Sequence, residues 1–181
     1  MQVAELAVPG LRLIRPDVFE DARGFVFESY NAERHRAAGI TCTFVQDNFS
    51  HSVKATLRGL HYQDEPGQAK LVSVTRGCIF DVAVDIRPAS PTLGRWVGVV
   101  LDAASREQLF LPKGFAHGFC VLSDAADVVY KLSSPYRAES ERCLAWNDPE
   151  LAIDWPIQAP LLSERDSRGE SFAGYRARIA P

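Results

Sequence analysis

Residues 80–87 read Phe-Asp-Val-Ala-Val-Asp-Ile-Arg, and larger apolar side chains occupy every second position. Phe80, Val82, Val84 and Ile86 therefore share one face of an extended chain, and the residues between them share the other. Alternation with a period of two is typical of a β-strand. The stretch predicts a strand that packs one of its faces on a core.

The same alternation recurs on both sides of this stretch. Gly, Pro, Asp and Ser separate the runs, as at Arg76-Gly77 and at residues 87–91, and the alternation resumes directly after each break. Short strands with such punctuation predict an antiparallel sandwich or barrel. We therefore expect residues 1–181 to form one domain. The further runs are Val72 and Val74, Val97 to Leu101, Leu109 and Leu111, Phe119 and Val121, and Val128 to Leu132.

Helix is scarce in this sequence. Asn31 is a suitable N-cap for a short exposed helix that runs through Ala38 and ends at Gly39. A second helical piece is expected near Ser163 to Arg168.

Composition excludes several classes of protein. The formal net charge of the 181 residues is −3, and no Lys/Arg cluster provides the basic face that nucleic-acid binding needs. Charged residues such as Glu5 and Arg12 interrupt any signal-like segment, and the apolar runs are too short to cross a membrane. Cys42, Cys78, Cys120 and Cys143 contain no C-x-x-C pair. We expect free thiols in a cytoplasmic protein.

The alternation points four chemically capable side chains into the predicted barrel. His61, Lys70, His117 and Tyr130 each share a strand face with apolar or amide neighbours. A buried polar group without a partner costs about 1–3 kcal/mol, so such residues are either satisfied or used. Their arrival from four strands predicts a functional site.

A metal site is one alternative for these residues. Pro112–His117 matches the P-x-G-x-x-H element of cupin barrels, in which the histidine often binds a metal. The earlier element, His61-Tyr62-Gln63, lacks the second histidine of an H-x-H pair, and the next inward residue is the cation Lys70. These residues are poor ligands for a divalent ion. We expect no metal.

An imidazole, an ammonium and a phenol suit removal of a proton next to a carbonyl group. A neutral histidine can accept that proton near neutral pH, and a lysine can stabilise the enolate that forms. A phenol on the other side can return a proton and invert the centre. No G-x-G-x-x-G or P-loop motif is present, so no cofactor is expected.

Several stretches, taken in order, resemble the dTDP-4-dehydrorhamnose 3,5-epimerase family. They extend from about residue 8 to about residue 166. The stretches are Asp21–Phe25 with Glu28, Gln46–Asn48, Arg58–Gln63, Gln68–Val72, Asp81–Arg87, Pro112–Phe119 and Asn147–Pro149.

The resemblance implies an all-β, cupin-type antiparallel jelly-roll barrel with a few short helices. It implies epimerisation at C3 and C5 of dTDP-4-keto-6-deoxy-D-glucose through an enolate, without a cofactor. His61 resembles the family's base, Asp166 the carboxylate that orients it, Lys70 the cation at the enolate oxygen and Tyr130 the proton donor.

The resemblance also implies the substrate-binding residues and a homodimer. Arg23 and Glu28 resemble residues that, in the family, reach the active site of the partner subunit. Arg58 resembles the family's contact to the diphosphate. The other implied binding residues are Gln46, Asp47, Asn48, His117, Glu141 and Arg165.

Three features of the sequence leave questions open. Regular alternation places Arg58 and His61 on opposite faces, so we expect a bend or bulge at Gly59. Arg165 stands where the family commonly has lysine, and Ala138 where it has proline. These departures lie near the C-terminal side of the site, where they bear on the choice of substrate, whereas the base, the cation and the phenol are retained. Epimerisation at one carbon, a metal-dependent oxygenase and a non-catalytic sugar-nucleotide binding module are the alternatives.

Overall fold

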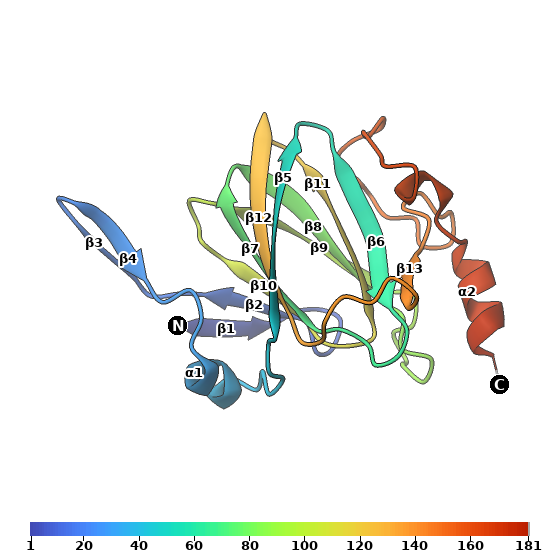
Figure 1. Cartoon of the computed structure of the whole chain (residues 1–181), viewed down its shortest axis with the longest axis horizontal. Coiled ribbons are helices and arrows are strands. Elements are labelled where there is room, and N and C mark those ends of the chain that lie inside the picture. The colour runs from blue at the N-terminus through green and yellow to red at the C-terminus, as the bar shows by residue number, and fades with distance from the viewer. Residues whose placement is uncertain (181) are drawn as a thin grey trace.

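Two antiparallel β-sheets face each other, and a two-stranded hairpin projects from them (Figure 1). The computed structural model describes residues 1–180. The larger sheet has the strand order β1-β2-β10-β7-β12-β5, and the smaller has the order β13-β6-β11-β8-β9. The expectation of an all-β jelly roll with short helices is confirmed. The strands are β1 (Gln2–Glu5), β2 (Arg12–Arg15), β3 (Val18–Asp21), β4 (Gly24–Phe27), β5 (Gln46–Val53), β6 (Leu57–Gln63), β7 (Lys70–Arg76), β8 (Cys78–Asp85), β9 (Trp96–Asp102), β10 (Gln108–Leu111), β11 (Phe115–Val121), β12 (Ala125–Leu132) and β13 (Glu141–Cys143).

The space between the two sheets is apolar at one end and polar at the other. Along β7 the inward side chain changes from Lys70 to Val72 and Val74, and the two valines belong to the main core cluster. Along β12 Val128 lies opposite Val74, and Leu132 lies opposite Lys70. The register therefore gathers the polar inward residues at one end of the barrel.

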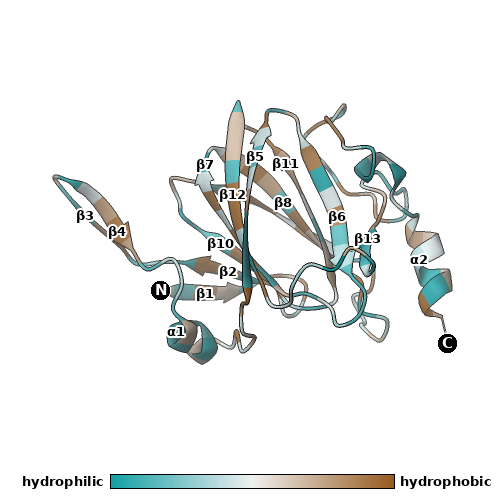
Figure 2. Cartoon of the chain, viewed as in Figure 1, coloured by the Kyte–Doolittle hydropathy of each residue, from teal (hydrophilic) through white to brown (hydrophobic). Residues whose placement is uncertain are grey.

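Strand β8, which contains most of the stretch quoted at the outset, is buried on both faces. Val82 and Val84 pack in a second cluster that includes Trp155 from the C-terminal segment. Ala83, between them, packs in the core between the sheets. Figure 2 shows β8 and β11 as largely hydrophobic strands. Val82 and Val84 therefore point out of the barrel, toward the segment that covers this sheet, whereas Ile79 points into the core between the sheets.

Helix α1 (Ala32–Ala37) forms where the sequence predicts it. The Asn31 side chain accepts hydrogen bonds from the backbone N–H groups of Glu33 and Arg34, 3.1 Å each. Gly39 follows the helix with φ of +84°. His35, expected on an exposed helix, is instead buried, with its Nδ1 2.8 Å from the Asn31 carbonyl oxygen. The histidine packs against Tyr30 and has a structural role.

The C-terminal segment carries two further helical elements. The 3-10 helix η1 (Asp166–Arg168) confirms the second helical piece. Helix α2 (Phe172–Ile179) was not expected, although Ser171 caps it and Phe172 and Tyr175 bury one side of it against the smaller sheet. Among residues 1–180, no helix is both long and apolar enough to cross a membrane.

A bulge interrupts strand β6 at Gly59, as expected. His61 pairs with His117, whereas Arg58 pairs with Phe119, so β6 has one extra residue at this point. Gly59 has φ of +116°, and a Cβ atom on it would lie 2.5 Å from the backbone of β11. Only glycine fits so close an approach with this backbone conformation. The bulge allows Arg58 and His61 to face the same cavity.

Candidate active site

A cavity of about 250 Å³ lies at the polar end of the barrel. Strands β5, β6, β7, β11 and β12 supply most of its wall, and the loop after β12 and the segment before η1 complete it. The expected site residues that line it are Asn48, Arg58, His61, Lys70, His117, Tyr130, Glu141 and Arg165.

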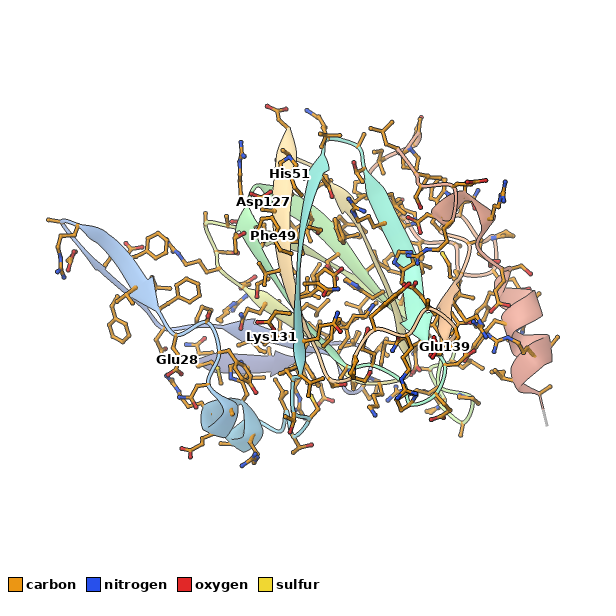
Figure 3. All side chains as sticks on the ribbon, in the orientation of Figure 1. Glu28, Phe49, His51, Asp127, Lys131 and Glu139 are labelled. Carbon is orange, nitrogen blue, oxygen red and sulfur yellow. The ribbon has the colours of Figure 1, made fainter. Side chains whose placement is uncertain are left out.

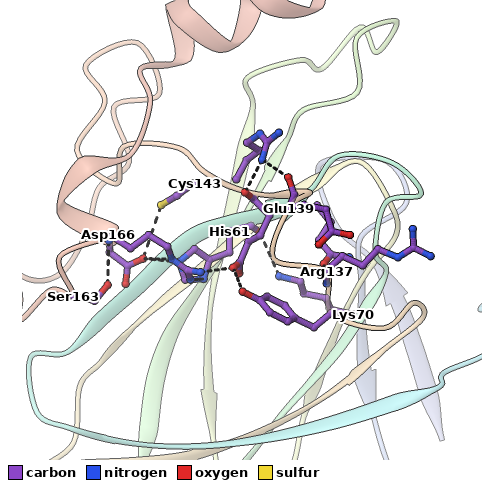
Figure 4. A network of polar contacts seen from close by, with 12 residues as sticks. His61, Lys70, Arg137, Glu139, Cys143, Ser163 and Asp166 are labelled. Atoms are coloured by element: carbon purple, nitrogen blue, oxygen red, sulfur yellow. Dashed lines mark hydrogen bonds and ion pairs between the residues drawn. The ribbon is translucent and has the colours of Figure 1, made fainter.

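His61 and Asp166 form a hydrogen-bonded pair at one wall of this cavity. Nε2 of His61 lies 2.5 Å from Oδ1 of Asp166, and the two residues are 105 positions apart in the sequence (Figure 4). The Ser163 hydroxyl accepts a hydrogen bond from the backbone N–H of Asp166, which fixes the start of η1. The carboxylate side chain is 4% exposed, so it has little solvent to compete with the imidazole.

The surroundings keep His61 neutral and Asp166 ionised. Burial lowers the pKa of His61, and the hydrogen bond to Asp166 only partly opposes this shift. Burial raises the pKa of Asp166 and is the largest single influence, but the hydrogen bonds from His61 and Ser163 and the nearby charge of Arg165 together outweigh it, so the net pKa is lowered. With Nε2–H donated to the carboxylate, Nδ1 is the ring nitrogen that holds a free lone pair. The pair has the form of an oriented general base.

Lys70 is a buried cation near this base. Its Nζ donates a hydrogen bond to the His61 carbonyl oxygen at 3.3 Å. Burial lowers the pKa of Lys70 to about 8, and the charges of Asp81 and Glu141 partly oppose the shift. A poorly solvated ammonium interacts strongly with a negative charge that forms beside it. Lys70 is suited to stabilise an oxyanion in the cavity.

His117 and Tyr130 occupy the walls supplied by β11 and β12. Nε2 of His117 lies 3.0 Å from both carboxylate oxygens of Asp81, which is fully buried. Asp81 thus orients His117, a partnership that the alternation of β8 alone did not suggest. Tyr130 pairs with Asn48 across β12 and β5. A phenol therefore lines the same cavity as the imidazole and the ammonium.

Arg165 and Glu141 close one side of the cavity. Arg165 Nη1 forms an ion pair with Glu141, and Tyr136 donates a hydrogen bond to the same carboxylate at 2.7 Å. Arg165 Nη2 lies 2.8 Å from Nε2 and 3.3 Å from Nδ1 of His61. A guanidinium so close to both nitrogens disfavours protonation of the ring.

Four of the expected binding residues do not line this cavity, although Gln46 donates a hydrogen bond to Asn48 at its wall. Asp47 points to the outer face of β5 and pairs with Lys131 at 2.9 Å, because its neighbours Gln46 and Asn48 take the inward positions. Arg23 and Glu28 belong to the projecting hairpin and the segment after it. Within one chain, therefore, the structure does not bring Asp47, Arg23 or Glu28 to the site.

One group of side chains has a donor set that could hold a metal ion. Ligand atoms of His61, Cys143 and Asp166 lie within 4.8 Å of one another. Arg165 touches the imidazole of this group, and its fixed positive charge would repel a divalent ion. The donor set therefore fits a metal poorly, and the expectation of no metal stays a prediction.

Comparison with known proteins identifies the family. The family model for dTDP-4-dehydrorhamnose 3,5-epimerase matches residues 5–174. The chain belongs to this family. A dTDP-4-dehydrorhamnose 3,5-epimerase from Pseudomonas aeruginosa is 54% identical over 96% of the chain and 97% of the relative.

Solved structures of epimerases share the fold. A dTDP-6-deoxy-D-glucose-3,5-epimerase from Legionella pneumophila, in complex with dTDP-4-keto-L-rhamnose, superposes with a TM-score of 0.95 at 48% identity and covers 99% of this chain and 97% of that one. A 3'-monoepimerase from Streptomyces bikiniensis, in complex with dTDP-quinovose, superposes with a TM-score of 0.90 at 36% identity. The match covers 98% of this chain and 91% of that one.

The epimerase cavity also contains residues that sequence reasoning missed. Tyr136 lies at its mouth, half exposed, and its backbone N–H donates to the Gln46 side chain at 2.9 Å. An aromatic residue soon after β12 was the available signal, but no periodicity marks a loop residue as part of a site. The other lining residues not expected are Ser50, Gln68, Phe119 and Leu132.

Proposed function

We propose that this chain inverts C3 and C5 of dTDP-4-keto-6-deoxy-D-glucose and so forms dTDP-4-keto-L-rhamnose. One observation carries the proposal: an oriented neutral imidazole, a buried ammonium and a phenol line one small cavity. Membership of the 3,5-epimerase family and the likeness to structures that hold dTDP-sugars support the same substrate class.

Each inversion needs a proton removed from one face of the sugar and a proton added to the other. Nδ1 of His61 takes the proton from the carbon next to the ketone, and the bond's electron pair moves to the ketone oxygen. Lys70 stabilises the enolate oxygen. The phenol of Tyr130 then protonates the carbon from the opposite face. Once the His61 imidazolium has lost its proton and the Tyr130 phenolate has regained one, with water as the carrier, repetition at the second carbon completes the reaction without any change of oxidation state.

The mouth of the cavity is suited to a nucleotide diphosphate. Arg58 lies there with its Nε bonded to Ser52 at 2.9 Å, and its remaining N–H groups can bind phosphate oxygens. Asn48 and Gln46 offer amide groups beside the exposed ring of Tyr136, against which a planar base can stack. These contacts would place the sugar deeper, next to His61.

A homodimer explains the residues that one chain leaves unused. The hairpin β3–β4 extends away from the two sheets (Figure 1) and exposes apolar side chains, among them Phe19 and Phe25. The outer face of β5 exposes Phe49 as well (Figure 3). Exposed apolar surface of this kind marks an interface. We infer that each hairpin carries Arg23 and Glu28 to the partner's site, and that the dimer works in the cytoplasm.

Incubation with the ketosugar in heavy water tests the proposed function. Proton NMR should show deuterium at both C3 and C5 of the product. Label at one carbon alone would instead assign the chain to single-centre epimerases, an alternative that the likeness to a 3'-monoepimerase keeps open. Tight binding without any exchange would indicate a binding module, and dependence on a transition metal would indicate an oxygenase.

The variant His61→Ala separates binding from chemistry. It should lose exchange at both carbons, because the base is gone, while affinity for dTDP stays close to that of the wild type. Near-normal exchange in this variant would overturn the role of His61.

A further inference from the structure

Two cavities share one wall beside the base. An outer cavity of about 520 Å³ lies next to the site cavity and is lined by residues of β13 and of the segment around η1. Glu141 and Arg165 line both cavities. At this point the wall between the two cavities therefore includes the ion pair between the Glu141 and Arg165 side chains.

The ion pair lies directly against the nitrogen that would hold the abstracted proton. Arg165 Nη2 lies 3.3 Å from Nδ1 of His61 and 2.8 Å from Nε2, the nitrogen that also faces Asp166. The Glu141 side chain is 15% exposed and the Arg165 side chain 50% exposed, so the arginine can leave for solvent more easily than the carboxylate. Cys143, which lines the outer cavity, lies 3.9 Å from Asp166 on the same side.

We propose that the Glu141–Arg165 pair is a gate that controls when the proton on His61 exchanges with water of the outer cavity. The inference rests on the proposed epimerase function and adds a step to it. A nucleotide sugar that fills the site cavity also fills its mouth, and so blocks the route by which solvent would otherwise reach the imidazole. The outer cavity offers a second route to the base.

The epimerase needs such a route because it uses one base at two carbons. After the first inversion His61 is an imidazolium, and its N–H bond must break, with the electron pair returning to the nitrogen, before it can attack the second carbon. Water in the outer cavity takes that proton when Arg165 moves away from the ring. When Arg165 returns, its charge again disfavours protonation and restores a neutral base. Glu141 and Arg165 are positioning residues in this step.

Arg165→Lys is the most direct test of the gate. A lysine keeps the charge but cannot reach Glu141 and cover the imidazole at once, because an ammonium lacks the planar fork of a guanidinium. In heavy water, at low conversion, the measured quantity is deuterium in recovered substrate relative to product formed. This ratio reports exchange on His61 before the proton returns to carbon. It should rise about fivefold, the change expected when a half-exposed ion pair is weakened.

A matched control and a second variant make the test decisive. Arg168→Lys alters an arginine that lines only the outer of the two cavities and pairs with Glu164, so its ratio should equal the wild-type ratio. Glu141→Gln should raise the ratio as Arg165→Lys does. If the lysine variant has no measurable turnover, the ratio of Glu141→Gln tests the gate in its place. An unchanged ratio in the active gate variants would overturn the gate, whereas a wild-type enzyme that exchanges no hydrogen would overturn the epimerase function itself.

Discussion

Burial lowers the pKa of both His61 and Lys70, and this shift helps the proposed role of the first but opposes that of the second. In the proposed mechanism His61 must be neutral to accept a proton, and burial favours that form because it lowers the pKa of the imidazole. Lys70 must be charged to stabilise the enolate, and burial lowers its pKa to about 8. The working range of the enzyme therefore lies between these two titrations.

The pH dependence of kcat/KM should follow these directions. Activity should rise with pH as His61 loses its proton, below the ordinary value of 6.5, and fall above a pH of about 8 as Lys70 loses its charge. Lys70→Arg should remove the fall at high pH, although its maximum will be lower, because a guanidinium stays protonated. A wild-type profile that stays flat up to pH 10 would contradict the role of Lys70.

Replacement of Tyr130 by phenylalanine should separate proton loss from proton return. Without the phenol, product formation should fall by about 10²–10⁴-fold, the usual effect of losing a general acid. Exchange of substrate protons through His61 should fall much less. The measurement compares deuterium wash-in with product formation in the same sample, and equal losses in both would argue against a donor role.

The decisive feature at the level of single elements is the bulge in β6. Gly59→Ala combines an unfavourable positive φ with a Cβ atom 2.5 Å from the backbone of β11. The free energy of unfolding should fall by about 2–4 kcal/mol, and activity should fall with it because His61 shifts. Gly24→Ala in the hairpin is the control, because Gly24 has φ of +127° but nothing within 4 Å of its Cβ position. If urea denaturation shows equal losses of unfolding free energy in the two variants, the close approach of Gly59 to β11 does not contribute to stability.

Most of the strands could be predicted, and the reason is their regular alternation. The faces were harder to assign: β8 is buried on both sides, so alternation marks the strand but not which face points into the barrel. Helix α2 was missed although Phe172, Tyr175 and Ile179 have helical spacing behind the cap at Ser171, because eight residues give a weak pattern. The pairing of His61 with Asp166 joins distant segments, and only the resemblance to a family indicated it.

At the scale of the whole molecule, the proposed dimer would add to each site the Arg23 that the cavity of a single chain lacks. The cavity holds the proposed base, cation and donor, while Arg23 lies on the hairpin with a side chain that is 90% exposed. A chain with Arg23→Ala and a chain with His61→Ala should each be nearly inactive. Mixed and allowed to exchange subunits, they should recover about a quarter of the wild-type activity, because about half of the dimers are mixed and each has one intact site. No recovery, with subunit exchange verified by mass spectrometry, would show that each chain builds its site alone.

The projecting hairpin also makes catalysis sensitive to how much enzyme is present. If Arg23 reaches the substrate only in an assembled pair, turnover per chain should decline on dilution below the dissociation constant of that pair. Added nucleotide sugar should delay the decline, since a ligand held by both subunits tightens their association. Cells that make little of this protein would then lose flux more steeply than the amount of protein alone predicts.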